Sequence, residues 1–127
     1  MKQLPAAQLE VMQIIWEAEN PVSRTEIQKC LPDNQWKIST LNTLLARLVQ
    51  SGFLRVEHRG KEYIYTPAVK RDEYMKYAGR SILNSLYGNS IKKFIVAAVY
   101  AEDELTNQDI KELESLLKEL KGCDADD

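Results

Sequence analysis

The 127-residue sequence contains no run of about 18 apolar residues, the length that a helix needs to cross a bilayer. In its first 16 residues, Gln and Glu interrupt the apolar positions, which indicates a helix rather than a secretory signal peptide. The only two cysteines, Cys30 and Cys123, lie far apart and form no C-x-x-C pattern. These absences predict a cytoplasmic protein with reduced thiols, without revealing the role of either cysteine.

Histidine is nearly absent as well. His58 is the only one, and no cysteine or carboxylate cluster accompanies it at the spacing of metal ligands. The sequence also lacks a Gly-rich phosphate loop and any Ser, His and acidic residues grouped as a catalytic set. We therefore expect no enzymatic activity, no metal and no cofactor.

Charge is distributed unevenly along the chain. The formal net charge is −2, but residues 24–80 contain eleven Lys and Arg against six Asp and Glu, a local balance of +5. The acids gather at 102–104 and over 109–127. A basic middle with an acidic tail is typical of an anion-binding module joined to another element.

The first half of the chain predicts three helices. Helical spacing runs over 6–19; a capping box, Ser23 to Glu26, then opens a short helix that Pro32 ends. The third helix covers 38–50, and Gly52 is suited to its C-terminal cap. Its apolar stripe consists of Ile38, Leu41, Leu44, Leu45 and Leu48.

The period of the sequence then changes from helix to strand. Alternating residues over 54–59 and 62–66 predict a hairpin that turns at Arg59-Gly60. From Arg71 onward, three further helical segments follow. This order predicts a mainly α protein with a small β-hairpin: a winged helix-turn-helix domain over 1–70 and a helical dimerisation domain over 71–127.

The polar face of the third helix carries short, mostly uncharged side chains, which allow a helix to approach base edges closely. The residues concerned are Ser39, Thr40, Asn42, Thr43 and Arg47. Taken alone, such a face could belong to an ordinary solvated helix. The hairpin tip adds two cations, Arg59 and Lys61, beside Gly60, as a wing that contacts phosphates would. Together the two features favour binding of double-stranded DNA.

The second half offers more apolar surface than a small domain can bury. The segment 91–101 is apolar on most sides, and the last helix has a leucine stripe. A monomeric core is the simpler alternative, but a two-fold dimer would cover both surfaces and match a palindromic operator. The predicted dimerisation residues are Ile91, Phe94, Ile95, Val99, Leu116, Leu117 and Leu120.

Two groups of residues have structural interpretations. Cys30, between Ile27 and Leu31 on a short helix, is expected to be a small buried side chain rather than a redox sensor. Four tyrosines are expected to pack the wing onto the helix that follows it, with a small-molecule pocket at the same place as the alternative: Tyr63, Tyr65, Tyr74 and Tyr77.

Other function classes remain to be compared with a DNA-binding repressor. A winged-helix adaptor that binds proteins and not DNA would suit the negative net charge, but its third helix would more often be apolar than polar. A metal-sensing repressor would need ligand clusters, and the sequence has none. The operator sequence, the regulated genes and the releasing signal cannot be read from the sequence.

Three stretches carry a family likeness: LEVMQIIWEAENPVSRTEIQKCL, STLNTLLARLVQSGFL and GKEYIYTPAVKRDEY. Together they resemble the penicillinase-repressor family, the BlaI/MecI-like transcriptional regulators. The likeness implies a winged-helix domain, a helical dimerisation domain and repression from a palindromic operator. It also implies that Ser39, Thr40, Asn42, Thr43 and Arg47 lie on the recognition helix, and Arg59 and Lys61 on the wing.

Two departures from that family concern the releasing signal. The antibiotic-resistance repressors are cleaved by a protease at an Asn-Phe bond, whereas the corresponding positions here are Ala97-Ala98. Copper-responsive relatives carry paired cysteines near the C-terminus, whereas this chain has Cys123 alone. These departures remove the cleavage site of that protease and the paired ligands of a copper site, so the releasing signal stays open.

Overall fold

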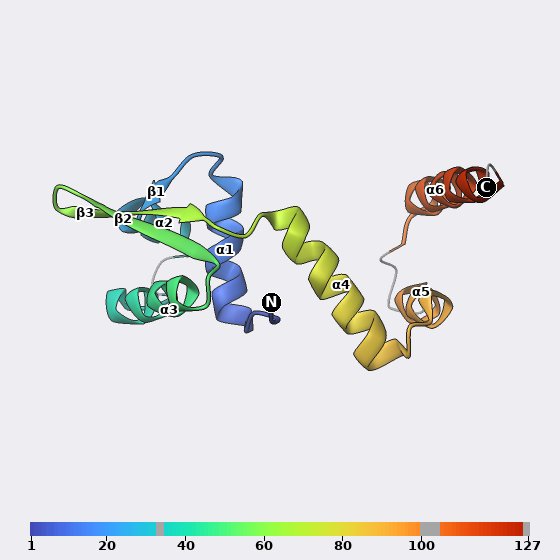
Figure 1. Ribbon diagram of the computed structural model, residues 1–127, viewed down its shortest axis with the longest axis horizontal. Coiled ribbons are helices and arrows are strands. Elements are labelled where there is room, and N and C mark those ends of the chain that lie inside the picture. Colours follow the sequence, from blue (N-terminus) through green and yellow to red (C-terminus); the bar gives the residue numbers. More distant parts are fainter. Residues whose placement is uncertain (33–34, 100–104, 126–127) are drawn as a thin grey trace. The chain divides into compact units, whose positions relative to one another are not determined.

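The computed structural model describes residues 1–32, 35–99 and 105–125. In these residues, three helices and a small sheet are followed by three more helices (Figure 1). In chain order the elements are α1 (Ala6–Glu17), β1 (Val22–Ser23), α2 (Arg24–Cys30), α3 (Ile38–Gln50), β2 (Leu54–Arg59), β3 (Glu62–Pro67), α4 (Arg71–Tyr87), α5 (Ile91–Val99) and α6 (Asn107–Ala125). The predicted mainly α fold class is confirmed.

Helix α1 ends two residues earlier than the sequence pattern predicts. At its C-terminal end, the carbonyls of Ile14 and Ile15 accept from the N–H of Ala18. Pro21 disfavours a helical conformation at the residue before it, so the chain leaves the helix before Asn20. Near the end of α1, the indole N–H of Trp16 donates to the carbonyl of Val69 at 2.9 Å and joins the helix to the segment after the sheet.

Helices α2 and α3 are bounded by the caps that the sequence predicts. The Ser23 hydroxyl accepts from the N–H of Glu26 at 3.2 Å, while the Glu26 carboxylate accepts from the N–H of Ser23 at 3.3 Å. At the end of α3, Gly52 has a φ of +84°, which lets Phe53 N–H bond to the carbonyl of Leu48 at 2.9 Å. This Schellman arrangement turns the chain directly into β2.

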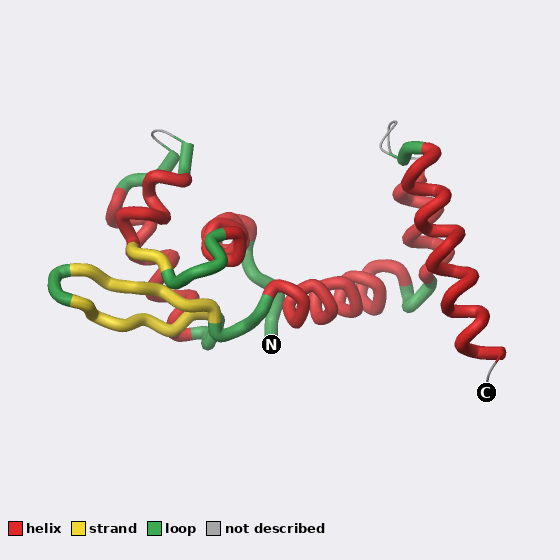
Figure 2. Tube along the Cα trace, turned by 90° about the horizontal axis from the view of Figure 1, so that it is seen from above, coloured by secondary structure: helices red, strands yellow, loops and turns green. Residues whose placement is uncertain are grey.

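The sheet has three antiparallel strands in the order β1-β3-β2, where the sequence predicted two. Strand β1 pairs Val22 with Tyr65, and two residues give no alternation that a pattern could detect. The β2–β3 hairpin is as predicted: its two strands run side by side to the tip (Figure 2), where Arg59 pairs with Glu62. Gly60 takes the first position of the two-residue turn with a φ of +61°.

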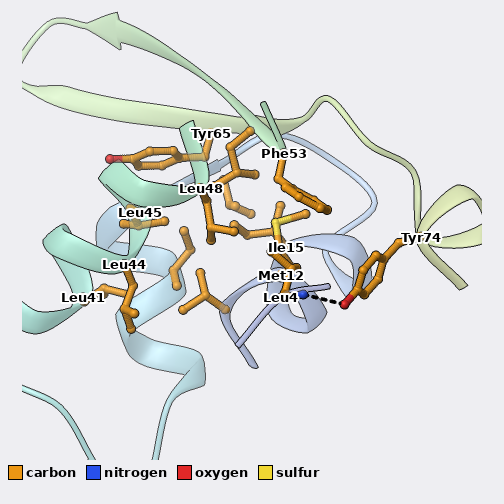
Figure 3. Packing of buried hydrophobic residues seen from close by; sticks show 14 residues of the cluster. Leu4, Met12, Ile15, Leu41, Leu44, Leu45, Leu48, Phe53, Tyr65 and Tyr74 are labelled. Carbon is orange, nitrogen blue, oxygen red and sulfur yellow. Dashed lines mark hydrogen bonds between the residues drawn. The ribbon is translucent and has the colours of Figure 1, made fainter. Parts of the chain in front are cut away.

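The described hydrophobic core lies entirely in residues 4–74 (Figure 3). Its centre is formed by the inner faces of α1 and α3, and the sheet base and the start of α4 close its edges. The buried hydrophobic residues are Leu4, Val11, Met12, Ile15, Val22, Ile27, Leu41, Leu44, Leu45, Leu48, Phe53, Leu54, Tyr65 and Tyr74.

Helix α4 begins as part of this first unit. The Tyr74 ring packs against Trp16 and Phe53, at centroid distances of 5.8 and 5.7 Å, and its hydroxyl accepts from the N–H of Leu4 at 2.8 Å. The chain accordingly divides into compact units at 1–79 and 80–127, within α4 and nine residues after the boundary expected from the sequence.

The second unit has no buried residue among those whose side chains the structure describes. Helix α6 is opened by a reciprocal cap: Thr106 Oγ1 accepts from the N–H of Asp109, and the Asp109 carboxylate accepts from that of Thr106. The hydrogen bonds that the Asp109 carboxylate accepts from Thr106, first from its backbone N–H and then from its side chain, lower the pKa of Asp109. The side chain of Cys123 and residues 100–101 of the predicted helix lie outside what the structure describes. No described helix has the length and apolarity to span a membrane.

Candidate nucleic-acid interface

Helix α3 separates an apolar inner face from a polar outer one. Its buried residues are Leu41, Leu44, Leu45 and Leu48. All five residues predicted to read DNA are exposed: Ser39, Thr40, Asn42, Thr43 and Arg47. Because the chain buries the leucines against α1, the polar side chains are presented to solvent on a rigid element.

The polar face has little charge and few internal bonds. The Thr43 hydroxyl donates to the carbonyl of Ser39 at 3.0 Å, which leaves its oxygen lone pairs available as acceptors. Arg47 is in neither ion pair found in the described part of the chain. Short hydroxyl and amide groups can therefore approach base edges without first breaking a strong contact.

The wing tip carries the two predicted cations, of which one is in an ion pair and the other is in neither ion pair of the described residues. Arg59 Nη2 lies 3.3 Å from the carboxylate of Glu57, and both side chains are largely exposed. An ion pair so exposed contributes at most about 1 kcal/mol and exchanges easily for a phosphate contact. Lys61 is exposed and takes part in neither of the described ion pairs. Behind the tip, His58 and Tyr63 stack edge to face at 4.7 Å between ring centroids, which stiffens the hairpin.

A groove of about 650 Å³ lies between the start of α2, the α3 face and the hairpin. Of the predicted site residues, it brings together Asn42 and Lys61, whereas the other five do not line it. Its full lining is Ser23, Arg24, Thr25, Ile38, Asn42, Ala46, Val49, Gln50, Val56, Lys61, Glu62, Tyr63 and Tyr65. Burial raises the pKa of Tyr65, and nearby Tyr63 raises it further while Arg24 opposes them.

Sequence reasoning did not anticipate this groove, and three of its apolar residues contradict the simple patterns. Ile38, assigned to the core stripe, is 50% exposed because it lies at the margin of the stripe in the first turn of α3. Val56 alternates as a core residue would, yet it is 39% exposed because the hairpin extends beyond the core. Tyr63 is 51% exposed. The groove could have been inferred from exposed apolar residues on both of its sides, Ile38 on α3 and Val56 on β2.

Two other structural interpretations were wrong. Cys30 is exposed, because Leu31, four residues after Ile27, takes the position facing the core. The tyrosines do not form one cluster: Tyr74 packs against Trp16, and Tyr77 lies 6.5 Å from Tyr74 between ring centroids, whereas the two hairpin tyrosines line the groove.

A family model described as penicillinase repressor matches residues 4–119. The penicillinase repressor of Bacillus licheniformis is 29% identical over 125 residues, which cover 96% of this chain and 97% of that protein. The methicillin resistance regulatory protein MecI of Staphylococcus aureus (strain N315) is 25% identical over 115 residues, which cover 91% of this chain and 93% of that protein.

Among solved structures, the solution structure of the DNA binding domain of the repressor BlaI is similar to this chain with a TM-score of 0.51 and 33% sequence identity. The similarity covers 57% of this chain and 88% of that domain, and it confirms the winged-helix fold. With a family model that matches nearly its whole length, this chain belongs to the penicillinase repressor family of DNA-binding, non-enzymatic transcriptional repressors.

Proposed function

We propose that this chain represses transcription in the cytoplasm by binding a palindromic operator as a homodimer, with helix 38–50 in the major groove and the wing 54–66 on the backbone. The observation that carries the proposal is the exposed, short-chain polar face of α3 beside a basic wing. In this arrangement Ser39, Asn42 and Thr43 read base edges. Thr40 and Arg47, which lie beside the face opposite the leucines, contact bases or phosphates. Arg59 and Lys61 contact phosphates without regard to sequence.

The dimer rests on the second unit. Ile91, Phe94, Val99, Leu116, Leu117 and Leu120 are exposed and Ile95 is half-buried, so the described part of this unit cannot bury its own apolar side chains. Apolar surface of this kind marks an interface, and a second copy of the same surface covers it with two-fold symmetry. That symmetry is also the symmetry of a palindrome. We therefore assign dimerisation to the second unit.

A protein-binding adaptor is the alternative function for a winged helix. The polar groups on α3 argue against it, because a partner protein would have to desolvate hydroxyl and amide groups that DNA edges can pair. An inactivating protease would need another cleavage site in this chain, since Ala97-Ala98 stand in place of the cleavable Asn-Phe pair.

The decisive experiment is selection of DNA fragments from a random pool by the full chain. We expect an enriched palindrome with two half-sites about 34–36 Å apart, or a multiple of that spacing, on one face of the duplex. Quantitative binding should then favour this site over random DNA by roughly 10³-fold or more at physiological salt. Recovery of no preferred sequence would contradict the proposed function.

The dimer is tested by placing a charged side chain in the proposed interface. Leu117→Glu should convert the full chain to a monomer in sedimentation, because an ionised carboxylate would be buried in the interface without a partner. Ser115→Glu, on the other side of α6, adds the same charge and should leave the dimer intact. A dimer that survives Leu117→Glu unchanged would place the interface elsewhere.

A further inference from the structure

A second pocket, separate from the groove beside α3, lies between the end of α1, the last residues of β3 and the start of α4. Its volume is about 320 Å³, which is enough for a small organic ligand. All of its lining residues belong to the first unit: Ile15, Trp16, Glu19, Asn20, Pro21, Thr66, Pro67, Lys70 and Arg71. None of them is among the residues predicted to contact DNA, so the proposed function gives this pocket no role.

Arg71, in the wall of this pocket, has a hydrogen-bond donor that the protein does not satisfy. Its Nη2 donates to the carboxylate of Glu17 at 2.8 Å, whereas its Nε is buried and has no hydrogen-bond partner among the described residues. A buried donor without a partner loses its water without compensation, and native proteins contain few such groups. The unmet donor therefore indicates that Arg71 gains an acceptor from outside the chain.

The ion pair that Arg71 does form is easily exchanged for another anion. The Glu17 side chain is 74% exposed and that of Arg71 37% exposed, and ion pairs so accessible to water stabilise only weakly. Lys70 adds a second cation, which is exposed and in neither ion pair of the described residues. Glu19 is the only acid among the lining residues. A carboxylate from solution can therefore replace Glu17 beside Arg71, as a small swing of the arginine brings its Nε within reach of an acceptor.

The apolar part of the pocket is suited to a flat hydrocarbon body. Trp16 is already held by its indole hydrogen bond and by its packing against Tyr74. The guanidinium carbon of Arg71 lies 6.0 Å from the centroid of the Trp16 ring, so a ligand bound to this cation has the indole beside it. Pro21 and Pro67 add further apolar surface. These rigid side chains lose little rotamer entropy when a ligand covers them.

We propose that this pocket binds a small organic carboxylate with a flat apolar body. Arg71 and Lys70 hold the carboxylate, and the body packs on Trp16. An arginine suits this role because its planar fork can donate to both oxygens of a carboxylate at once. The inference goes beyond the proposed function and does not depend on it, because no residue of the predicted DNA-reading face takes part.

The test is calorimetric titration of the full chain with benzoate, with benzamide as its uncharged analogue. Benzoate should bind saturably, one per chain, with a Kd of about 1 mM or tighter. Benzamide should bind at least about tenfold more weakly, because it has no charge to pair with the two cations. Acetate and inorganic phosphate, which lack the ring, should also bind at least about tenfold more weakly. The proposal is wrong if benzoate does not saturate, or if any of the other three binds as tightly.

The fluorescence of Trp16 locates the bound ligand. In a full-length Trp36→Phe variant, Trp16 is the remaining tryptophan. Benzoate should change its emission with the same Kd that calorimetry gives. Emission that stays constant while calorimetry shows binding would place the ligand elsewhere and contradict the proposal.

Two substitutions separate ligand binding from the structural role of the ion pair, since both abolish that pair. Arg71→Gln should weaken benzoate binding about tenfold or more, because it removes a charged donor. Glu17→Gln should instead strengthen binding by up to about fivefold, because it removes the competing carboxylate. Lys76→Gln, an exposed site of α4 outside the pocket, is the matched control and should leave binding unchanged.

Circular dichroism of each variant confirms that the fold is retained. If Arg71→Gln binds benzoate as well as Lys76→Gln does, the arginine does not hold the carboxylate. If Glu17→Gln weakens binding as much as Arg71→Gln, the ion pair only shapes the pocket and the proposal fails.

Discussion

The hydrogen bond between Leu4 and Tyr74 joins the N-terminus to α4 and can be removed without disturbing its surroundings. Tyr74→Phe keeps the ring contacts with Trp16 and Phe53 but deletes the hydroxyl that accepts from the Leu4 N–H at 2.8 Å. The bond is buried, so its loss leaves a donor without a partner and out of reach of water. We expect the free energy of unfolding to fall by about 1–2 kcal/mol.

The appropriate material is a fragment of residues 1–79, since all of the described core lies within it. For a domain of this size the change corresponds to a fall in Tm of roughly 4–16 °C. Tyr74→Ala removes the ring as well and should destabilise by about 3–5 kcal/mol or more. That is a large part of the total stability of about 4–12 kcal/mol expected for such a fragment. A fragment that ends at residue 70 lacks the tyrosine altogether and should be weakened comparably.

Urea unfolding, followed by circular dichroism and by the fluorescence of Trp16 and Trp36, measures both effects. Tyr77→Phe is the matched control, because its hydroxyl makes no hydrogen bond in the part of the chain that the structure describes. The control should change the free energy of unfolding by less than about 0.5 kcal/mol. If Tyr74→Phe destabilises no more than Tyr77→Phe at equal m-values, the bond does not hold α4 to the first unit.

Three further predictions concern the reading helix, the wing and a cap. Asn42→Ala and Thr43→Ala should each reduce affinity for the selected palindrome by about 1–3 kcal/mol per half-site and leave binding to random DNA nearly unchanged; equal losses on both would exclude α3 as the reader. Arg59→Ala combined with Lys61→Ala should weaken binding to every sequence and reduce the salt slope by about 1.8 per protomer, so an unchanged slope would remove the wing from the interface. Gly52→Ala should destabilise the 1–79 fragment by about 1 kcal/mol in urea unfolding, because its φ of +84° strains a residue with a Cβ although no atom lies within 4 Å of that Cβ; full stability would mean that the turn relaxes.

Much of the architecture follows from local rules that the sequence displays directly. The reciprocal bonds of Ser23 and Glu26, the turn at Gly60 and the cap at Gly52 each depend on residues within a few positions of one another. Local interactions of this kind set where helices and hairpins begin and end. The polar face of α3 could be predicted for the same reason, since helical periodicity determines which side chains share a face.

Packing between distant segments was not predictable in this way. Strand β1 exists because the edge of β3 is available to Val22, and the pairing joins residues more than 40 positions apart. The start of α4 belongs to the first unit because Tyr74 reaches Leu4, 70 positions away. A pattern in one segment contains no information about which other segment covers it.

The candidate site also has one part that local sequence determines and another that depends on packing between distant segments. The sequence by itself determined which residues form the polar face predicted to read DNA, because short polar side chains opposite a leucine stripe are a property of one helix. Only the tertiary structure brought Arg24, Ile38 and Val56 to one groove, since they come from α2, α3 and β2. It also decided that Ile38 and Val56 are exposed and that Cys30 is not buried. Burial depends on where an element ends relative to the core, and that position is set by the packing of the whole first unit.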